Sequence, residues 1–393
     1  MSHISIVPII AGNVIEKVAV CAGSKRITFN VFATGYNTTV YQAEKSIHKV
    51  NDLIDAAANG GHRVLVYNWR NWLRATRKYA KNTALWYCDR IFDPVNEIKA
   101  DSIEQLSEEV IKIKPAMWMS TYANAALTYE WMEKNPILIN GFRAYSHWNY
   151  DSYSGRSKSF ERPLQNLEEG THIADPINME RDRIVTVDWK AADLIIAAYL
   201  SGDQVLVDKI INGDIYSEFQ DSADDRQDTK RAILSALYRA DDSTLAAVSI
   251  KLAQWVAQQI EIVKTDNAVE SYFGRRYSVT ESGNRSVLSV FNAQIQGAIA
   301  LAMMRVLPKI QVIPGASLLF ETHDAVTVAA RAESVPSVIK SMCEIMYRPF
   351  SGMNINGLEV KMPVTFSCGK LYGVKSISGE FRDGKLKMMK GTS

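Results

Sequence analysis

The spacing of hydrophobic residues separates an N-terminal part, in which strands alternate with helices, from a helical part. β-Branched runs typical of strands cover RITFNVFATG (26–35) and HRVLVYNW (62–69). Between them, EKSIHKVNDLIDAAANGG (44–61) has the apolar spacing of an amphipathic helix that ends at glycines. From residue 101 to about 135 the spacing becomes helical. We therefore expect a small α/β domain at 1–98, followed by helices.

Two apolar runs in the second half of the chain lead into an aspartate. IVTV leads into Asp188, and a strongly apolar helix pattern follows. SLLFETHDAVTV places Asp324 between two strand-like runs, which predicts a hairpin turn. A carboxylate at a strand end can face a cleft while the sheet holds its backbone. Each residue also has a plainer interpretation, because aspartate commonly caps helices and favours turns.

A helix is predicted between the two aspartates, over RQDTKRAILSALYRA (226–240). Arg226, Lys230, Leu234 and Tyr238 follow one another at steps of four, so they share one broad face. Two cations on such a face can bind the phosphates of a triphosphate, although a solvated basic face is the ordinary interpretation. With two carboxylates on a sheet, the helix indicates two divalent metals beneath a nucleoside triphosphate, as in a nucleotidyl transferase.

Composition and charge limit the number of domains, the kind of nucleic-acid surface and the cellular compartment, but they do not indicate the reaction. A length of 393 residues suits two or three domains, and 47% hydrophobic with 22% charged residues is ordinary for a globular protein. The net charge of +2 requires any nucleic-acid surface to be a local groove. We find no signal peptide and no apolar run of about 18 residues that predicts a membrane span. The four cysteines form no CxxC pair, so we expect a reducing cytoplasm: Cys21, Cys88, Cys343 and Cys368.

Eight segments, in order along the chain, resemble the motifs of the family A DNA polymerases, the group of bacterial DNA polymerase I. The resemblance covers roughly Ala144 to Tyr372, and the order of the eight makes it specific. The segments are HWNYDSYSGRSKSFERPLQNLEEG, DWKAADLIIAAYLSGD (motif A), GDIYSEF, RQDTKRAILSALYRA (motif B), FGRRY, FNAQIQGAIA, THDAVTV (motif C) and SCGKLYG, after which a basic tail ends the chain.

The resemblance implies an α+β multidomain fold with a right-hand polymerase over residues 144–393. An antiparallel palm sheet would bring Asp188 and Asp324 within about 4–6 Å, because two metals lie about 3.5–4 Å apart in such sites. Helical fingers would cover about 205–268, and residues 99–143 would form a reduced thumb-like region.

The family's roles transfer to matching positions. Asp188 and Asp324 would bind two Mg²⁺ ions, for which Mn²⁺ is an alternative, with the backbone carbonyl of Trp189 completing the metal shell. Lys230 would act with Arg226 on the triphosphate and would stabilise or protonate the leaving group.

The resemblance also implies contacts with nucleotide and DNA. Tyr238 would lie beside the nascent base pair, with Leu234 and Asp193 around the incoming dNTP. Eight residues would contact primer, template or the minor groove, where contacts can test geometry without reading sequence. They are Arg156, Gln165, Asn166, Arg275, Arg276, Asn292, Gln296 and His323.

Four positions depart from the family pattern. Asp193 replaces the motif A glutamate that excludes ribonucleotides, and the shorter side chain predicts weaker discrimination. Leu234 replaces the motif B aromatic residue, and Arg239 replaces the glycine after its tyrosine. Ala325 removes a third carboxylate after Asp324, which we do not expect to abolish activity.

The first 98 residues resemble a degenerate 3′–5′ exonuclease domain. TFNVFATGYN and VLVYNWRNWL match two of its motifs, but Asn30, Phe32 and Trp72 stand where metal-binding carboxylates would be. We expect a structural domain without proofreading activity; an unrelated α/β domain is the alternative.

We therefore expect a monomeric, cytoplasmic DNA polymerase that uses primer-template DNA and dNTPs, with no membrane partner and with other replication proteins as further candidate partners. The alternatives are a primase or single-subunit RNA polymerase on the same palm, or an inactive DNA-binding relic. Small size and a degenerate exonuclease favour a phage or mobile-element source.

Overall fold

The computed structural model describes residues 3–11, 14–22, 25–31, 40–76, 90–94, 103–113, 116–150, 152–161, 163–220, 225–279 and 286–389. The chain forms two compact units, one of residues 1–131 with 273–275 and one of residues 132–272 with 276–393. The first unit extends past the predicted boundary at residue 98. The exonuclease-like and thumb-like interpretations stay predictions.

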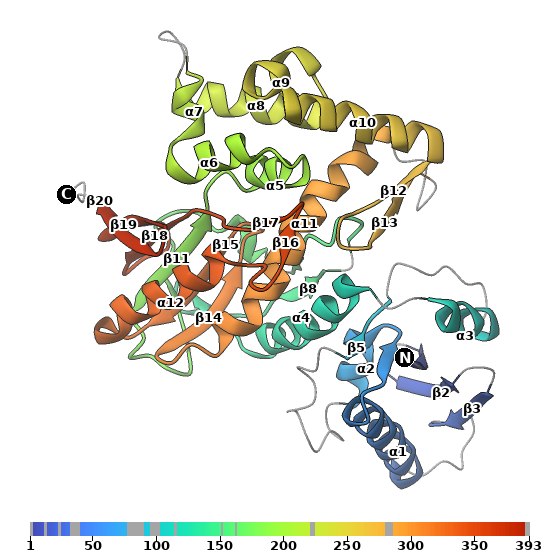
Figure 1. Ribbon diagram of the computed structural model, residues 1–393. Coiled ribbons are helices and arrows are strands. Elements are labelled where there is room, and N and C mark those ends of the chain that lie inside the picture. Colours follow the sequence, from blue (N-terminus) through green and yellow to red (C-terminus); the bar gives the residue numbers. More distant parts are fainter. Residues whose placement is uncertain are drawn as a thin grey trace. The chain divides into compact units, whose positions relative to one another are not determined.

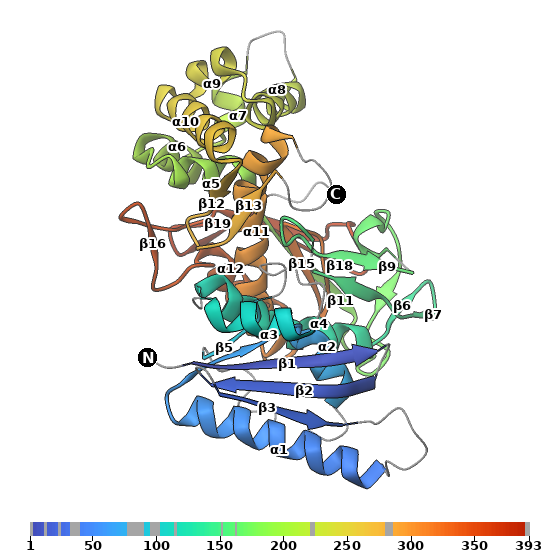
Figure 2. The ribbon, with the colours of Figure 1, turned by 90° about the vertical axis from the view of Figure 1, so that its right-hand side faces the viewer.

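The first unit is built on a five-stranded mixed sheet in the order β3-β2-β1-β4-β5. β1 pairs antiparallel with β2 and parallel with β4. Figure 2 shows α1 running alongside β3. The strands are β1 (His3–Ala11), β2 (Val14–Ala22), β3 (Lys25–Asn30), β4 (Arg63–Val66) and β5 (Ile91–Phe92), and the helices are α1 (Val40–Asn59), α2 (Trp69–Thr76), α3 (Ile103–Lys112) and α4 (Met117–Lys134), whose last residues enter the second unit.

These elements confirm the α/β pattern predicted for the start of the chain. The run at 26–35 overlaps β3, the run at 62–69 contains β4, and the amphipathic run at 44–61 lies largely in α1. Asn30 ends β3 and Trp72 is buried in α2, so neither supplies a carboxylate. The third exonuclease position, Phe32, lies outside the described residues.

The second unit is organised around a six-stranded sheet in the order β14-β15-β11-β18-β19-β20, and every neighbouring pair is antiparallel. This confirms the predicted antiparallel sheet. Its strands are β11 (Arg183–Trp189), β14 (Ala316–Glu321), β15 (Ala325–Ala330), β18 (Val364–Gly369), β19 (Ile377–Arg382) and β20 (Lys385–Met389).

Three strands of this sheet, β11, β18 and β19, alternate between buried and more exposed positions, as expected for strands covered on one side. α12 (Val335–Tyr347) packs against β11, β18 and β19 on the apolar face. The indole Nε1 of Trp189 donates a hydrogen bond to the carbonyl of Met346 in that helix, over 2.7 Å. The end of β11, which carries Asp188, is therefore held against α12.

Helices dominate the chain between β11 and β12, and Figure 1 shows α6–α10 gathered together in yellow-green. They are α5 (Ala192–Leu200), α6 (Gln204–Asn212), α7 (Ile215–Glu218), α8 (Arg226–Arg239), α9 (Asp242–Val248) and α10 (Ile250–Asp266). The described residues of 205–268 are therefore mainly helical, as predicted.

Short elements complete the second unit. β6 (Ile137–Ile139), β7 (Phe142–Ala144) and β10 (Ile173–Ala174) form a small sheet, and β8 (His147–Asn149) pairs with β9 (Lys158–Phe160) before the 3-10 turn η3 (Leu164–Asn166). The other short elements are β12 (Ala268–Glu270) with β13 (Arg276–Ser278), the turn η4 (Ala332–Ser334), and β16 (Asn354–Ile355) with β17 (Leu358–Glu359).

One helix departs from the expectation about apolar runs. α11 (Val287–Gln311) is long and apolar enough to cross a membrane by length and composition, although we expected no such apolar run. However, 72% of its most apolar window is buried inside the structure, as in a core helix. It packs against α5, α10, α12 and β14.

The end of the chain also departs from expectation. What we predicted as a basic tail forms the hairpin β19–β20, which adds two strands to the sheet. Its turn is Asp383-Gly384, and both residues have positive φ, 47° and 76°. Asp-Gly is a strong signal for such a two-residue turn.

Candidate active site on the six-stranded sheet

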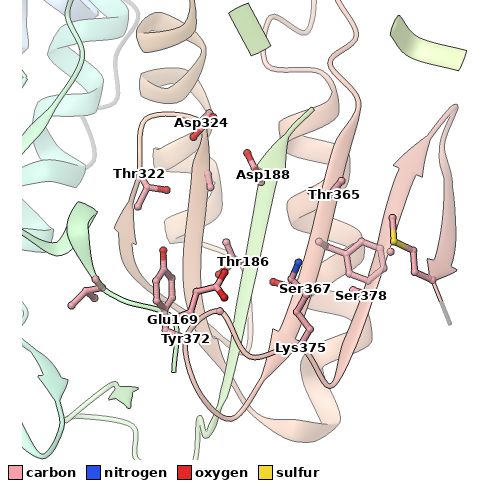
Figure 3. Close-up of a pocket in the computed structure, with 16 residues that line it drawn as sticks. Glu169, Thr186, Asp188, Thr322, Asp324, Thr365, Ser367, Tyr372, Lys375 and Ser378 are labelled. Carbon is pink, nitrogen blue, oxygen red and sulfur yellow. The ribbon is translucent and has the colours of Figure 1, made fainter. Parts of the chain in front are cut away.

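The sheet brings the two predicted aspartates to neighbouring strand ends (Figure 3). β11 pairs with β15 so that Asp188 lies opposite Ala325, the residue after Asp324. The backbone N–H of Trp189 donates to the carbonyl of Asp324 over 3.0 Å. Both aspartates line one cavity and the charge of Asp324 raises the pKa of Asp188, so the two carboxylates share one site. The prediction that the fold unites them is confirmed.

The plainer interpretation of Asp188 as a helix cap is wrong. α5 begins after Ala191, a left-handed residue with φ 53° that makes no side-chain cap. Asp324 does lie in the predicted turn between β14 and β15.

That turn is held by a buried residue that sequence reasoning missed. Glu321 is 1% exposed, and its carboxylate accepts a hydrogen bond from the backbone N–H of His323 over 2.6 Å. His323 has φ 66°, a left-handed conformation that is costly away from glycine. The side-chain amide of Gln165 also donates to Glu321, over 3.3 Å. Glu321 therefore fixes the backbone that presents Asp324.

Burial and like charge make the carboxylate pair costly to ionise. Oδ1 of Asp188 is buried and accepts no hydrogen bond from any described residue. Burial and the negative charge of Asp324 raise the pKa of Asp188 to about 8, while Lys230 and Lys375 act in the opposite direction. The residue Asp324 is itself open to solvent, yet the surrounding protein and the Asp193 carboxylate also raise its pKa.

A bound cation would offset the repulsion between the two carboxylates and the cost of burying them, so the residues fit a divalent metal. An unpartnered, buried carboxylate oxygen beside a second carboxylate is a hard oxygen donor set of the kind that Mg²⁺ prefers. Among the described residues no group of three or more His, Cys, Asp or Glu side chains gathers as a metal site. Protein oxygens beyond the two carboxylates would have to come from the backbone.

α8 carries the predicted basic residues toward this site. Lys230 is half-buried and close enough to lower the pKa of both aspartates. Arg226 is held instead by Asp214, with Nε–Oδ2 and guanidinium–Oδ1 distances of 2.5 and 3.0 Å. Both cations lie over the ring of Tyr216, at 5.9 Å for Lys230 and 5.5 Å for Arg226. Sequence reasoning missed the Asp214–Arg226 pair, although GDIYSEF contains Asp214 and Tyr216.

A second cluster joins α5, α8 and the loop after β8. The hydroxyl of Tyr238 donates a hydrogen bond to the carboxylate of Asp193. Arg156 contacts the same carboxylate over 3.4 Å. The side chain of Gln296 also hydrogen-bonds Tyr238, and burial with the Asp193 charge raises the tyrosine's pKa above its usual range. An aspartate at position 193 therefore holds the tyrosine by a hydrogen bond. Leu234 lies half-buried on the same helix.

Of the remaining residues predicted to contact DNA, some lie near the two aspartates or the Asp193–Tyr238 cluster, and others do not. Asn292 lies near the cluster, where its amide donates to the carbonyl of Tyr238 over 3.1 Å. Nδ1 of His323 is buried and has no hydrogen-bond partner among the described residues. Burial and the nearby Arg156 and Lys158 lower the pKa of His323.

Gln165 and Asn166 lie on η3, where Gln165 is occupied by Glu321 and Ser157 and Asn166 is exposed. Two residues are not brought to the aspartates by any described contact. Arg275 is buried over the ring of Trp118 at 5.2 Å, within the first unit, and Arg276 is exposed on β13.

A cavity of about 500 Å³ extends from the two aspartates along the polar face of the sheet. Figure 3 shows Asp188 and Asp324 at one end, Lys375 toward the other, and Thr186 and Ser367 between them. No α8 residue lines it. Its hydroxyl-rich lining was not found from the sequence, because it depends on the register of strands that are far apart along the chain.

Comparison with known proteins supports the resemblance. The chain is 26% identical over 266 residues to the thermostable DNA polymerase I of Thermus aquaticus, and 28% identical over 261 residues to that of Thermus thermophilus. These matches cover 54% and 53% of this chain but only 32% and 31% of the relatives, so the chain spans about a third of their length. The chain is thus a distant homologue of DNA polymerase I of family A.

No protein-family model matches the chain. The structure matches the POL domain of Pol1 from M. smegmatis, in complex with DNA primer-template and dNTP, with a TM-score of 0.46 and 17% identity, over 84% of this chain and 65% of that one. The relatives are bacterial and give no support to the predicted phage or mobile-element source.

Proposed function

We propose that the chain is a template-directed DNA polymerase that adds dNTPs to a primer 3′-hydroxyl. One observation carries the proposal: Oδ1 of the half-buried Asp188 is itself buried and unpartnered among the described residues, beside Asp324 and with Lys230 as a nearby cation. The homology to DNA polymerase I supports the same chemistry. In this proposal the six-stranded sheet is the palm, α6–α10 form the fingers, and residues 99–143 form a reduced thumb.

Asp188, Asp324 and the backbone carbonyl of Trp189 would hold two Mg²⁺ ions, or Mn²⁺ in their place. When bound, the metals supply charge stabilisation and a lower pKa for the attacking hydroxyl. The Asp188 carboxylate would then stay ionised at neutral pH, because a bound cation would offset the burial of Oδ1 and the charge of Asp324 that raise its pKa.

Lys230 would contact the triphosphate on the side opposite the cavity and stabilise the charge of the leaving pyrophosphate. Arg226 would join it by leaving Asp214, because the two lie on one face of α8, four residues apart. Tyr216, beneath both cations, would set their height above the site.

Asp193 and Tyr238 would form the wall against the sugar of the incoming nucleotide, with Leu234 along the same helix. The hydrogen bond between them fixes the tyrosine ring, and Arg156 and Gln296 fix the pair in turn. Arg156, Asn292, Gln296 and His323 would contact the primer terminus or the minor groove. We propose a weaker, peripheral DNA role for Gln165, Asn166 and Arg276, and none for the buried Arg275.

Primer extension tests the proposal. The full chain, Mg²⁺, a primed template and dNTPs should give products of template-encoded sequence. Faster extension with NTPs, or synthesis without a primer, would favour the RNA polymerase or primase alternative. Primer-template binding with no extension would favour an inactive relic. The homology also leads us to propose an intracellular location and a monomer.

A further inference from the structure

The hairpin β19–β20 lies beyond the residues that resemble the polymerase family, yet it extends the sheet that carries the aspartates. Strand register places its residues in rows with the site. One row crosses four strands through Asp188, Thr365, Glu380 and Lys387. Residues in one such row project from the same face of a sheet. Lys387 therefore shares the face of Asp188, three strands away.

The same face carries two further lysines. The next row on this face, two residues along each strand from Glu380 and Lys387, ends at Ser378 and Met389. Both of these residues line the cavity that begins at the aspartates. Side chains two residues apart along a strand share a face, so Lys385 and Lys387 lie on the side of Met389. Lys375 lines the cavity itself. A line of cations thus borders the polar face, beginning in the cavity and ending at the sheet edge.

These lysines form no ion pair within the part of the chain that the structure describes, although Lys375 lowers the pKa of Asp188 and shares the cavity with Glu169. No hydrogen bond or ion pair joins Lys375, Lys385 or Lys387 to any residue that the structure describes. Glu380, the nearest acid by register, is occupied by Lys190 at 3.3 Å and by Arg382 at 2.7 Å. Elsewhere lysines are often paired along their own helix, as Lys264 is with Glu261 and Lys340 with Glu344. All three lysines are exposed cations without an ion pair, so an external anion can reach them.

We propose that Lys375, Lys385 and Lys387 bind successive phosphates of the nucleic-acid strand whose 3′ end lies at Asp188 and Asp324. The inference rests on the proposed function. Three strand spacings of about 4.8 Å place Lys387 about 14 Å from β11, a span of about four nucleotides at a rise of 3.4 Å. The triphosphate is the weaker candidate occupant, because no residue of α8 lines this cavity.

The salt dependence of DNA affinity tests the two hairpin lysines. A fluorescent primer-template is titrated with the full chain between 50 and 200 mM KCl, without dNTPs. Each lost phosphate contact lowers the slope of log affinity against log salt by about 0.9, so Lys385→Gln/Lys387→Gln should lower it by about 1.8. Over that range, wild-type affinity should fall about 12-fold more than the variant's. The charge-matched control Lys264→Gln/Lys340→Gln should keep the wild-type slope.

Neutral methylphosphonate linkages identify the strand. Placed at the second to fifth phosphates from the primer 3′ end, they should lower the wild-type slope by about 2.7, and the double variant's by only about 0.9, because Lys375 is the one contact that the variant retains. The same effect from linkages in the template strand would overturn the strand assignment. An unchanged slope in the double variant would overturn the site, whereas a wild-type chain that binds no primer-template would overturn the proposed function instead. Lys375→Gln should add a further decrease of about 0.9.

Discussion

Replacing Asp188 by asparagine should stabilise the metal-free protein at pH 8, although it removes a residue essential to the proposed activity. The folded protein keeps a proton on this carboxyl up to a pKa of about 8, whereas the unfolded chain releases it near 3.8. Between these values the folded state binds more protons, so its stability falls as pH rises. One such group contributes a slope of about 1.4 kcal/mol per pH unit.

The asparagine variant lacks this titration, so the two stability curves should converge near pH 4 and separate toward pH 8. We expect the variant to be more stable by about 2 kcal/mol or more at pH 8. This figure is smaller than the whole pKa shift of Asp188 would give, because part of that shift belongs to the interacting pair of carboxylates. Urea unfolding followed by tryptophan fluorescence, with EDTA, measures the difference. Added Mg²⁺ should stabilise the wild type and leave the variant unaffected. Parallel pH curves would show that the pKa of Asp188 is not raised in the folded protein.

Three further predictions concern the rest of the site. Lys230→Ala should slow dNTP incorporation by at least about 100-fold, a typical loss for one stabilising contact, with little change in DNA affinity; Arg231→Ala, an exposed neighbour paired with Asp228, is the control, and an equal loss of DNA affinity would make Lys230 a DNA-groove residue. Asp193→Glu should increase the preference for dNTP over NTP in single-nucleotide incorporation, because the longer side chain reaches about 1.5 Å further toward the sugar; unchanged discrimination would separate this residue from sugar selection. A mismatched primer should not be trimmed from its 3′ end, since Asn30, Phe32 and Trp72 cannot bind metals as carboxylates do; metal-dependent trimming that survives Asp188→Ala would contradict this.

The features that could be predicted from the sequence depend on residues close together along the chain. The apolar runs before Asp188 and Asp324 predicted β11 and the β14–β15 hairpin, and the four-residue steps of α8 predicted its basic face. The resemblance placed Asp193 and Tyr238 around the same nucleotide, and the structure joins the two by a hydrogen bond.

Other features depend on side chains that meet only after folding. Nothing near Glu321 in the sequence indicates that it would be buried beneath the turn of His323. The pairing of Arg226 with Asp214 likewise arises from the approach of two helices. The β19–β20 hairpin is different, because Asp383-Gly384 between alternating residues was a usable signal that we took for a tail.

The central claim is that the two aspartates perform nucleotidyl transfer on a bound primer. Single-turnover primer extension, paired with equilibrium DNA binding, tests it in the wild type, Asp188→Ala and Asp324→Ala. Removing a metal ligand forfeits several kcal/mol of transition-state stabilisation, so each variant should lose at least about 10³-fold in rate. Their DNA affinity should stay near that of the wild type, because phosphate contacts elsewhere supply it. Template-directed extension by either variant at the wild-type rate would contradict the account.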